Sequence, residues 1–156
     1  MTTIAWDGKT LASDSQAQAS GIICSMSEVK IYQPQVDERW SIYGETVLAI
    51  GCSGDCGAEV ELKKLLSGNL TYESPFVKSF SFSALAVVGE NRAYIIYKAK
   101  DEEKAAISLQ TEPYAVGSGG VVARVAMHCG KDAAESVDIA IAMDPHSGGN
   151  IQRYQI

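Results

Sequence analysis

Residues 2–14 read TTIAWDGKTLASD and predict a β-hairpin near the start of the chain. Asp7-Gly8 is a strong hairpin signal, and it lies between two apolar runs that include Ile4 and Leu11. The two predicted strands bring residues 2 and 14 to the same end of the hairpin. The hairpin therefore places the beginning of the chain beside an acidic residue.

The register of this hairpin decides which side chains share a face. A two-residue loop places Thr2 opposite Ser13, whereas a three-residue loop with Lys9 and a glycine-assisted bulge places Thr2 opposite Asp14. A shift of one residue turns every side chain of a strand to the other face, so only the three-residue loop puts Thr2 and Asp14 on one side. We predict the three-residue loop.

Thr2 has a second property, because removal of Met1 would leave it with both a hydroxyl and a free α-amine. A hydroxyl is a weak nucleophile until a base takes its proton, and an N-terminal amine is a known activating base for threonine. The reference pKa of that amine is roughly 7.7 to 8.0, so part of it is unprotonated near neutral pH. On this feature alone, an ordinary first strand is the commoner interpretation of a Met-Thr start.

Further short motifs follow in a fixed order along the chain. They are Thr2-Thr3-Ile4, Ala12-Ser13-Asp14-Ser15-Gln16-Ala17, Lys30, Gly51-Cys52-Ser53-Gly54-Asp55, Gly117-Ser118-Gly119-Gly120 and Asp144-Pro145-His146-Ser147-Gly148-Gly149. Their order and spacing resemble the proteasome β-type subunits and their bacterial relative HslV, the N-terminal threonine peptidases. The resemblance implies an α+β fold, a four-layer αββα sandwich of two antiparallel sheets known as the Ntn-hydrolase fold.

The resemblance also implies catalytic roles. Thr2 Oγ1 would attack a peptide carbonyl while the Thr2 amine, through a water, accepts the hydroxyl proton. Lys30 would lie beside Thr2 and favour the deprotonated forms of its amine and hydroxyl, and Asp14 would hold the Lys30 ammonium by a charge-assisted hydrogen bond. Without the resemblance, Lys30 would be interpreted as a surface lysine and Asp14 as a turn residue.

Four more catalytic positions match the family. Gly51 would present its backbone N–H to the oxyanion, and a glycine lets the backbone approach the substrate closely. Ser118, Asp144 and Ser147 match the polar residues that orient the terminal amine and its water. His146 lies in the same motif, but the family makes no use of that position, so we interpret it as a loop residue.

The substrate pocket is assigned by position within the family pattern. Its expected lining residues are Ala17, Glu28, Tyr32, Ala49 and Ser53. A small residue at 49 leaves the pocket deep, and Glu28 would favour a basic side chain if it points inward.

Composition agrees with a cytoplasmic enzyme of one domain, residues 1–156. The length suits a single core, and the net charge of −6 without any cluster of basic residues argues against nucleic acid as a partner. Neither a membrane span nor a secretion signal is expected. Without a secretion signal the four cysteines should stay reduced. Because the sequence has only two histidines as further ligands, we expect no metal site, and we also expect no cofactor.

The pattern of elements fits a sandwich with one departure. Strands are predicted over 22–32, 40–50, 80–88 and 93–98, and helices from an Asp55 N-cap to Gly68, over 122–129, and over 133–141 behind a capping box of Asp132 and Glu135. Family members usually carry a second long helix after the first. Here Pro75 interrupts residues 72–78, so that outer helix is expected to be missing or shortened.

Three classes of function remain open at this point. The first is a ring-forming, self-compartmentalising threonine peptidase that degrades unfolded polypeptides and relies on an ATP-driven AAA+ unfoldase for folded ones. The second is an amidohydrolase of the same fold that acts on a small amide. The third is a dormant proteasome-like subunit with a structural role. We also expect ordinary removal of Met1 to suffice for activation.

Overall fold

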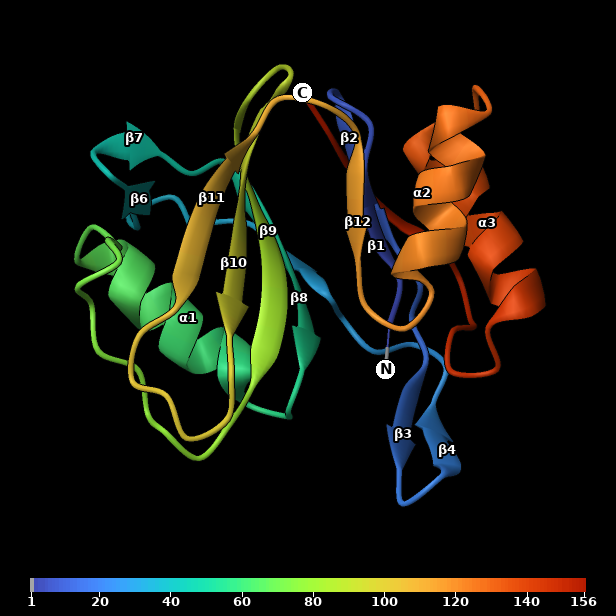
Figure 1. Ribbon diagram of the computed structural model, residues 1–156, viewed down its shortest axis with the longest axis horizontal. Helices are drawn as coiled ribbons and strands as arrows, with labels where there is room; N and C mark the ends of the chain where they lie inside the picture. The colour runs from blue at the N-terminus through green and yellow to red at the C-terminus, as the bar shows by residue number, and fades with distance from the viewer. Residues whose placement is uncertain (1) are drawn as a thin grey trace.

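The computed structural model describes residues 2–156 and consists of two β-sheets packed face to face between helices (Figure 1). The first sheet has the strand order β12-β1-β2-β13, and the second has the order β11-β10-β9-β8-β5. Helices α2 and α3 cover the outer face of the first sheet, and α1 covers the outer face of the second (Figure 1). The predicted four-layer αββα sandwich is therefore confirmed.

The strands and helices have the following bounds. The first sheet contains β1 (Ile4–Trp6), β2 (Thr10–Ser13), β12 (Tyr114–Val116) and β13 (Gln152–Gln155), and the second contains β5 (Ile31–Tyr32), β8 (Ala49–Gly54), β9 (Phe82–Gly89), β10 (Arg92–Lys98) and β11 (Ala106–Gln110). Two small antiparallel pairs are formed by β3 (Ala17–Ala19) with β4 (Ile22–Ser25) and by β6 (Ser41–Ile42) with β7 (Glu45–Thr46). The helices are α1 (Ala58–Ser67), α2 (Gly120–His128) and α3 (Ala133–Met143).

Each space between layers holds its own apolar cluster. Alternation along β1 sends Ile4 and Trp6 toward the second sheet and Ala5 toward α2 and α3, because successive side chains of a strand point to opposite faces. The cluster between the sheets contains large residues, whereas the cluster beneath α2 and α3 is rich in alanine, which lets these helices approach the first sheet closely. A third cluster, with Trp40 and Leu62 among its members, fills the space beneath α1.

The predicted hairpin exists, but its predicted register is wrong. Trp6 pairs with Leu11 and not with Thr10, one residue beyond the expected register. The carboxylate of Asp7 accepts hydrogen bonds from the N–H groups of Lys9 and Thr10, and the Asp7 N–H donates to the Thr10 carbonyl. This local closure by the Asp7 side chain replaces the three-residue loop.

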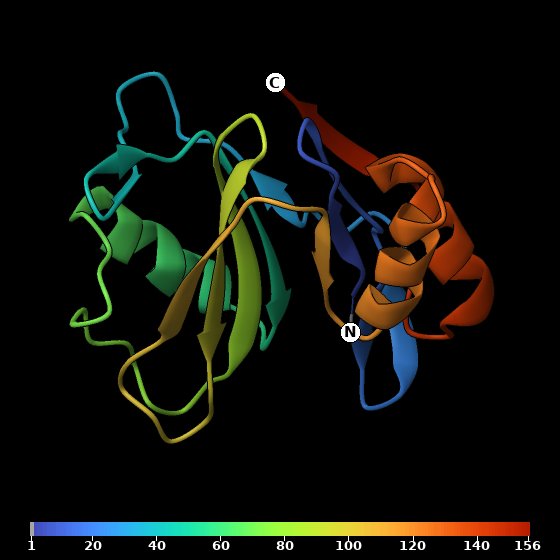
Figure 2. The same ribbon diagram turned by 45° about the horizontal axis from the view of Figure 1, so that its top comes forward.

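Three other predictions on the elements need correction. The expected strand over 22–32 is interrupted after Ser25, and its first part pairs with β3 in a ribbon that projects from the sandwich beside the N-terminus (Figures 1 and 2). The expected strand over 40–50 is likewise divided among β6, β7 and β8. The N-cap of α1 is Gly57 and not Asp55, whose carboxylate instead accepts the N–H of Ser81.

The remaining helix predictions are confirmed. α1 ends at Ser67 with Gly68 as its C-cap, and α3 begins with the predicted capping box, in which Asp132 and Glu135 each accept the other's backbone N–H. Within the described residues, 68–81 contain no helix, so the expected shortening of the outer helix is also present. No helix in residues 2–156 has the length and apolar character needed to cross a membrane.

Candidate active site at Thr2

The side chains of Thr2, Lys30 and Asp14 meet at one end of the first sheet. Lys30 Nζ lies 2.8 Å from Thr2 Oγ1 and 2.9 Å from Asp14 Oδ1. All of these residues are buried, and Lys30 is only 5% exposed. Thr2 precedes β1, Asp14 follows β2 and Lys30 precedes β5, so three chain segments each contribute one group.

The contact between Thr2 and Asp14 is made through Lys30 and not by a shared strand face. In the observed register Asp14 lies across from Thr3, with the Asp14 N–H donating to the Thr3 carbonyl over 3.2 Å. Strict alternation would then send Thr2 and Asp14 to opposite faces. Both residues lie beyond the ends of the paired strands, where the lysine reaches both oxygens.

The Asp14 carboxylate is held by several donors besides Lys30. Its Oδ1 accepts the N–H of Thr3 at 3.0 Å, and its Oδ2 accepts the N–H groups of Gln16 at 3.2 Å and Gly148 at 3.0 Å. A fully buried carboxylate is costly without such partners. Asp14 is therefore fixed in position, and it fixes the Lys30 ammonium in turn.

Lys30 is a buried cation with a strongly shaped environment. Its ammonium also donates to the carbonyl of Gln16. Burial lowers the pKa of Lys30, and the hydrogen bond and charge of Asp14 offset part of that effect. A positive charge next to Thr2 Oγ1 favours the alkoxide form of the hydroxyl during attack on a carbonyl.

A second polar group surrounds the nitrogen of Thr2. This nitrogen lies 3.2 Å from Ser118 Oγ, which donates to Asp144 Oδ2 at 2.6 Å. Ser147 Oγ also donates to Asp144 Oδ2, at 2.7 Å, and lies 2.7 Å from Thr3 Oγ1. The three residues predicted to orient the terminal amine thus form one connected network, in which Ser118 alone reaches the Thr2 nitrogen.

Asp144 carries the negative charge of this network. Burial raises its pKa, but hydrogen bonds from Ser118, Ser147 and the N–H of His146 outweigh burial and hold the pKa below its usual value. The His146 ring turns away to Gln18, with Nδ1 at 2.9 Å from the amide oxygen. The structure thus leaves His146 outside the hydrogen bonds made to Thr2.

Two glycines that the sequence marked only as part of a motif prove necessary for the site. Gly117 has a φ of +95°, and a Cβ there would overlap the carbonyl oxygen of Thr2. A Cβ at Gly119 would overlap Thr3 Oγ1. Side chains at these positions would push the start of the chain away from Ser118, so the glycines permit the close approach.

Gly51 is not brought into this cluster. It pairs with Ile31 of β5 on one side and with Leu85 of β9 on the other, so its N–H points toward a neighbouring strand. A Cβ at Gly51 would lie 2.6 Å from Cγ2 of Ile4, which explains the glycine by the packing of β1 against β8. The oxyanion role of Gly51 stays a prediction that these contacts do not support.

A cavity of about 310 Å³ opens beside Thr2 and Lys30. Three of the predicted pocket residues, Ala17, Glu28 and Tyr32, line it. Ser53 instead lines an adjoining cavity of about 450 Å³. Ala49 lines neither, because it is fully buried between the sheets, and its predicted place in the pocket is not supported.

The wall of the Thr2 cavity also contains residues that were not predicted to line it. Asp55 and Glu59 add two carboxylates to that of Glu28, and three cysteines complete the wall, Cys24, Cys52 and Cys56. The Lys63 ammonium lies 3.7 Å from the centre of the Tyr32 ring. These side chains come from segments far apart in sequence, so no local pattern could have grouped them.

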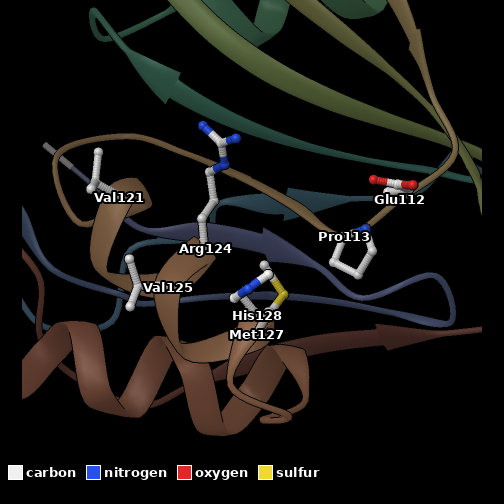
Figure 3. A pocket seen from close by; sticks show the side chains of 7 residues that line it. All are labelled: Glu112, Pro113, Val121, Arg124, Val125, Met127 and His128. Carbon is white, nitrogen blue, oxygen red and sulfur yellow. The ribbon is translucent and has the colours of Figure 1, made fainter.

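A larger cavity of about 590 Å³ lies elsewhere, against α2 (Figure 3). Val121, Arg124 and His128 of that helix line it together with Glu112 and Pro113. It contains none of the predicted site residues. Its volume is therefore no argument for placing the chemistry there. Across residues 2–156, no group of His, Cys, Asp or Glu side chains has an arrangement that could hold a metal ion.

Comparison with known proteins identifies the fold. No protein-family model and no curated protein matches the sequence. Among solved structures, BPH of Thiobacillus denitrificans in complex with epoxomicin aligns with a TM-score of 0.64 at 15% identity, covering 99% of this chain and 97% of that chain. Anbu, an ancestral β-subunit, from Yersinia bercovieri aligns with a TM-score of 0.54 at 11% identity, covering 100% of this chain and 87% of that chain.

These alignments define the fold of the chain. The chain has the fold of the proteasome-β-like N-terminal-nucleophile hydrolases, as the sequence resemblance implied. Identities of 11% and 15% carry nothing finer than the fold, so the comparisons do not support the narrower HslV-like assignment.

Proposed function

We propose that this chain is a threonine peptidase of the proteasome β type, in which Thr2 is the nucleophile once Met1 has been removed. One observation carries the proposal. A buried ammonium, Lys30, lies within hydrogen-bonding distance of both the Thr2 hydroxyl and the Asp14 carboxylate. A lysine serves this purpose better than an arginine, because its compact charge fits beside a hydroxyl.

The proposed reaction proceeds through an ester. Thr2 Oγ1 attacks the peptide carbonyl carbon while the hydroxyl proton passes, through a water, to the Thr2 amine. Collapse of the tetrahedral intermediate breaks the C–N bond, and the leaving amine takes up that proton. Water then hydrolyses the ester and restores the Thr2 hydroxyl. Lys30 stabilises negative charge on Oγ1 in both steps, while Ser118, with Asp144 and Ser147 behind it, orients the amine.

Met1 lies outside the described residues, but its chemistry sets the condition for activity. While Met1 is attached, the nitrogen of Thr2 is an amide and has no basic lone pair. The unprocessed chain should therefore be inactive however well Lys30 and Asp14 are placed. Threonine is small enough for an ordinary methionine aminopeptidase to remove the methionine before it.

The cavity beside Thr2 is the proposed pocket for the side chain that precedes the cut bond. Glu28 lines it from one segment, and Asp55 and Glu59 line it from around the start of α1, so we expect it to prefer a cationic side chain. Ala17 and Tyr32 form part of its wall, and Ser53 borders the adjoining cavity. We also propose that residues 1–156 act as one domain and that the physiological substrates are unfolded polypeptides.

The deciding experiment joins intact mass to peptide hydrolysis. We expect wild-type protein to cleave a fluorogenic peptide only in preparations whose mass shows loss of Met1, and aminopeptidase treatment to activate the rest. An epoxyketone should add to Thr2 through its hydroxyl and amine. Epoxomicin, present in the BPH structure, is a suitable reagent.

The matched variant for that experiment is Thr2→Ala, which removes the hydroxyl together with one methyl group. It should abolish both hydrolysis and the epoxyketone adduct while the protein stays folded. Wild-type turnover by Thr2→Ala, or full activity from chains that all retain Met1, would refute the assigned nucleophile. Complete loss of Met1 with no activity on any peptide would point to a dormant subunit instead.

A further inference from the structure

Three of the four cysteines converge on the Thr2 cavity. Cys24 comes from β4, Cys52 from β8 and Cys56 from the turn before α1, and all of them line the cavity that contains Thr2. None of them forms a disulfide. The fourth, Cys129, follows α2 on the outside of the other sheet and lines none of the cavities described above (Figure 1).

The three cavity thiols differ in their access to solvent. Cys24 and Cys56 are exposed, whereas Cys52 lies deeper in the wall. Burial raises the pKa of Cys52 to about 12, so its thiol stays protonated at neutral pH. The thiolate is the reactive form of cysteine, so Cys52 should react slowly. Cys24 and Cys56 are exposed, so a reagent in solution can reach them. Cys56 also lines the adjoining cavity, so it stands where the two meet.

The electrostatic environment of these thiols is acidic. Glu28, Asp55 and Glu59 line the same cavity, and within residues 2–156 none of these carboxylates forms an ion pair with a lysine or arginine. The positive charge of Lys30 is matched by Asp14. Lys63 places a further positive charge beside Tyr32 of the wall, so the three carboxylates still leave the cavity with a net negative charge. A cleft of net negative charge raises the local concentration of cationic small molecules.

We propose that Cys24 and Cys56 form a thiol-modification site at the mouth of the Thr2 cavity, which takes small cationic disulfides by thiol–disulfide exchange. The cysteine thiolate attacks one sulfur of the reagent, a new S–S bond forms and the reagent's own S–S bond breaks. The other half of the reagent leaves as a thiolate and takes up a proton. A free thiol reverses the reaction by the same exchange.

Modification at this position blocks the cavity. The attached group occupies space that a substrate side chain needs in order to present its carbonyl to Thr2, so peptide hydrolysis stops until the mixed disulfide is reduced. This consequence rests on the proposed peptidase function, whereas the modification itself does not. The site would make the peptidase responsive to the thiol–disulfide balance of its surroundings.

The test compares two disulfides of opposite charge on the protein as isolated. Cystamine is a small dication and glutathione disulfide is an anion, and peptide mapping by mass spectrometry gives the rate of labelling at each cysteine. We expect the ratio of the cystamine rate to the glutathione disulfide rate to be about tenfold higher at Cys24 and Cys56 than at Cys129. This ratio should fall as salt is added. Cys129 serves as the internal control for an exposed thiol outside the cavity.

Hydrolysis is measured in parallel on the same samples. Full labelling by cystamine should reduce peptide cleavage by at least about tenfold, as a blocked approach to the nucleophile requires, and dithiothreitol should restore it. The Cys24→Ser/Cys56→Ser double variant should lose this sensitivity, each sample being compared with its own unlabelled form. Cys129→Ser should keep it.

The outcomes separate this proposal from the proposed function. Two results would overturn the proposed thiol-modification site and leave the proposed peptidase function standing. One is an equal ratio of cystamine to glutathione disulfide labelling rates at Cys24, Cys56 and Cys129, and the other is a fully labelled protein that still cleaves peptide at its unlabelled rate. A protein that cleaves no peptide before labelling would refute the peptidase, while the charge ratios would still decide whether the cationic modification site exists.

Discussion

At the scale of single residues, Lys30 connects the parts of the candidate site. Its ammonium is the only group described here that touches both Thr2 Oγ1 and Asp14, and burial makes its charge expensive unless these oxygens stay in place. The nucleophile, the cation and the carboxylate therefore depend on one another. Loss of the Thr2 hydroxyl should therefore lower the rate, whereas loss of the Lys30 or Asp14 charge leaves its buried partner uncompensated and should lower stability as well.

Replacement of Lys30 gives the first prediction at this scale. Lys30→Ala should lower the turnover number on a fluorogenic peptide by about 100-fold or more, the usual size of lost acid–base support. Asp14→Asn should be less damaging, because the lysine remains. Lys131→Ala, at an exposed lysine that pairs with Glu135, is the control and should leave turnover unchanged. An unchanged rate constant in Lys30→Ala would exclude its electrostatic role.

Asp144 gives a prediction on pH. Its pKa in the folded protein lies below its usual value, which is about 3.9. The charged carboxylate therefore stabilises the folded state above that pH, and the contribution disappears as the pH falls through the lower folded value. Asp144→Asn should lower the melting temperature at pH 7 and make less difference near pH 3. An equal loss at both pH values would contradict this account.

At the scale of elements, the capping box of α3 offers a test of local stability. Asp132→Ala removes the acceptor for the Glu135 N–H and should lower the free energy of unfolding by about 1 kcal/mol. Urea denaturation measures it. Lys131→Ala again serves as the control, since it removes only the exposed ion pair with Glu135 and leaves both hydrogen bonds of the cap in place. Equal midpoints for the two variants would show that the cap contributes nothing.

The elements also show what a single sequence can and cannot predict. The capping box of α3 and the two strands β9 and β10 depend on neighbours in sequence, and both were predicted. The register of the first hairpin was not, because the Asp7 side chain closes the loop at Thr10 by hydrogen bonds that a turn motif does not reveal. The break after Ser25 was missed because exposed Ile22 and Ile23 resemble strand core until their pairing with β3 is known.

Some residues of the candidate site were also predicted from the sequence, and others were not. Thr2, Lys30 and Asp14 lie together as the family resemblance implied, and so do Ser118, Asp144 and Ser147. The resemblance included Cys52 and Asp55 in a motif without placing them on the cavity wall, and it did not include Cys24, Cys56 or Glu59, because these side chains meet only through the tertiary fold. Gly51 was assigned by motif alone, and motif spacing does not determine the direction of a backbone N–H.

At the scale of the whole molecule, the outer surfaces bear on assembly. Exposed apolar side chains lie on the outer helices, with Val60 on α1 and Val121 and Val125 on α2. Larger patches of this kind are typical of surfaces that bind another protein. The second outer helix of the family pattern is absent from residues 68–81. Self-association through these exposed side chains stays a prediction. An AAA+ unfoldase partner stays an expectation from the resemblance alone.

We predict a cyclic oligomer in solution. Head-to-tail contacts close into rings, and a chamber for unfolded polypeptides needs about six or more subunits around the axis. Light scattering coupled to size exclusion at micromolar concentration measures the mass. A monomer or a simple dimer would move the assignment to a small-amide hydrolase, which needs no chamber. If an oligomer forms, Val121→Glu and Val125→Glu test whether α2 lies in a contact between subunits.

The carboxylate of Asp14 has a consequence for the order in which the protein is made. It accepts the N–H of Gly148, and the strand before it pairs with β13 near the other end of the described chain. A ribosome releases Thr2, Asp14 and Lys30 long before residues 144–155 exist. Until those residues are made, Asp14 lacks a donor and Ser118 lacks the Asp144 that positions it. The proposed nucleophile is thus made early, but it acquires the fixed Asp14 and Ser118 of the folded site only after residues 144–155 have been made.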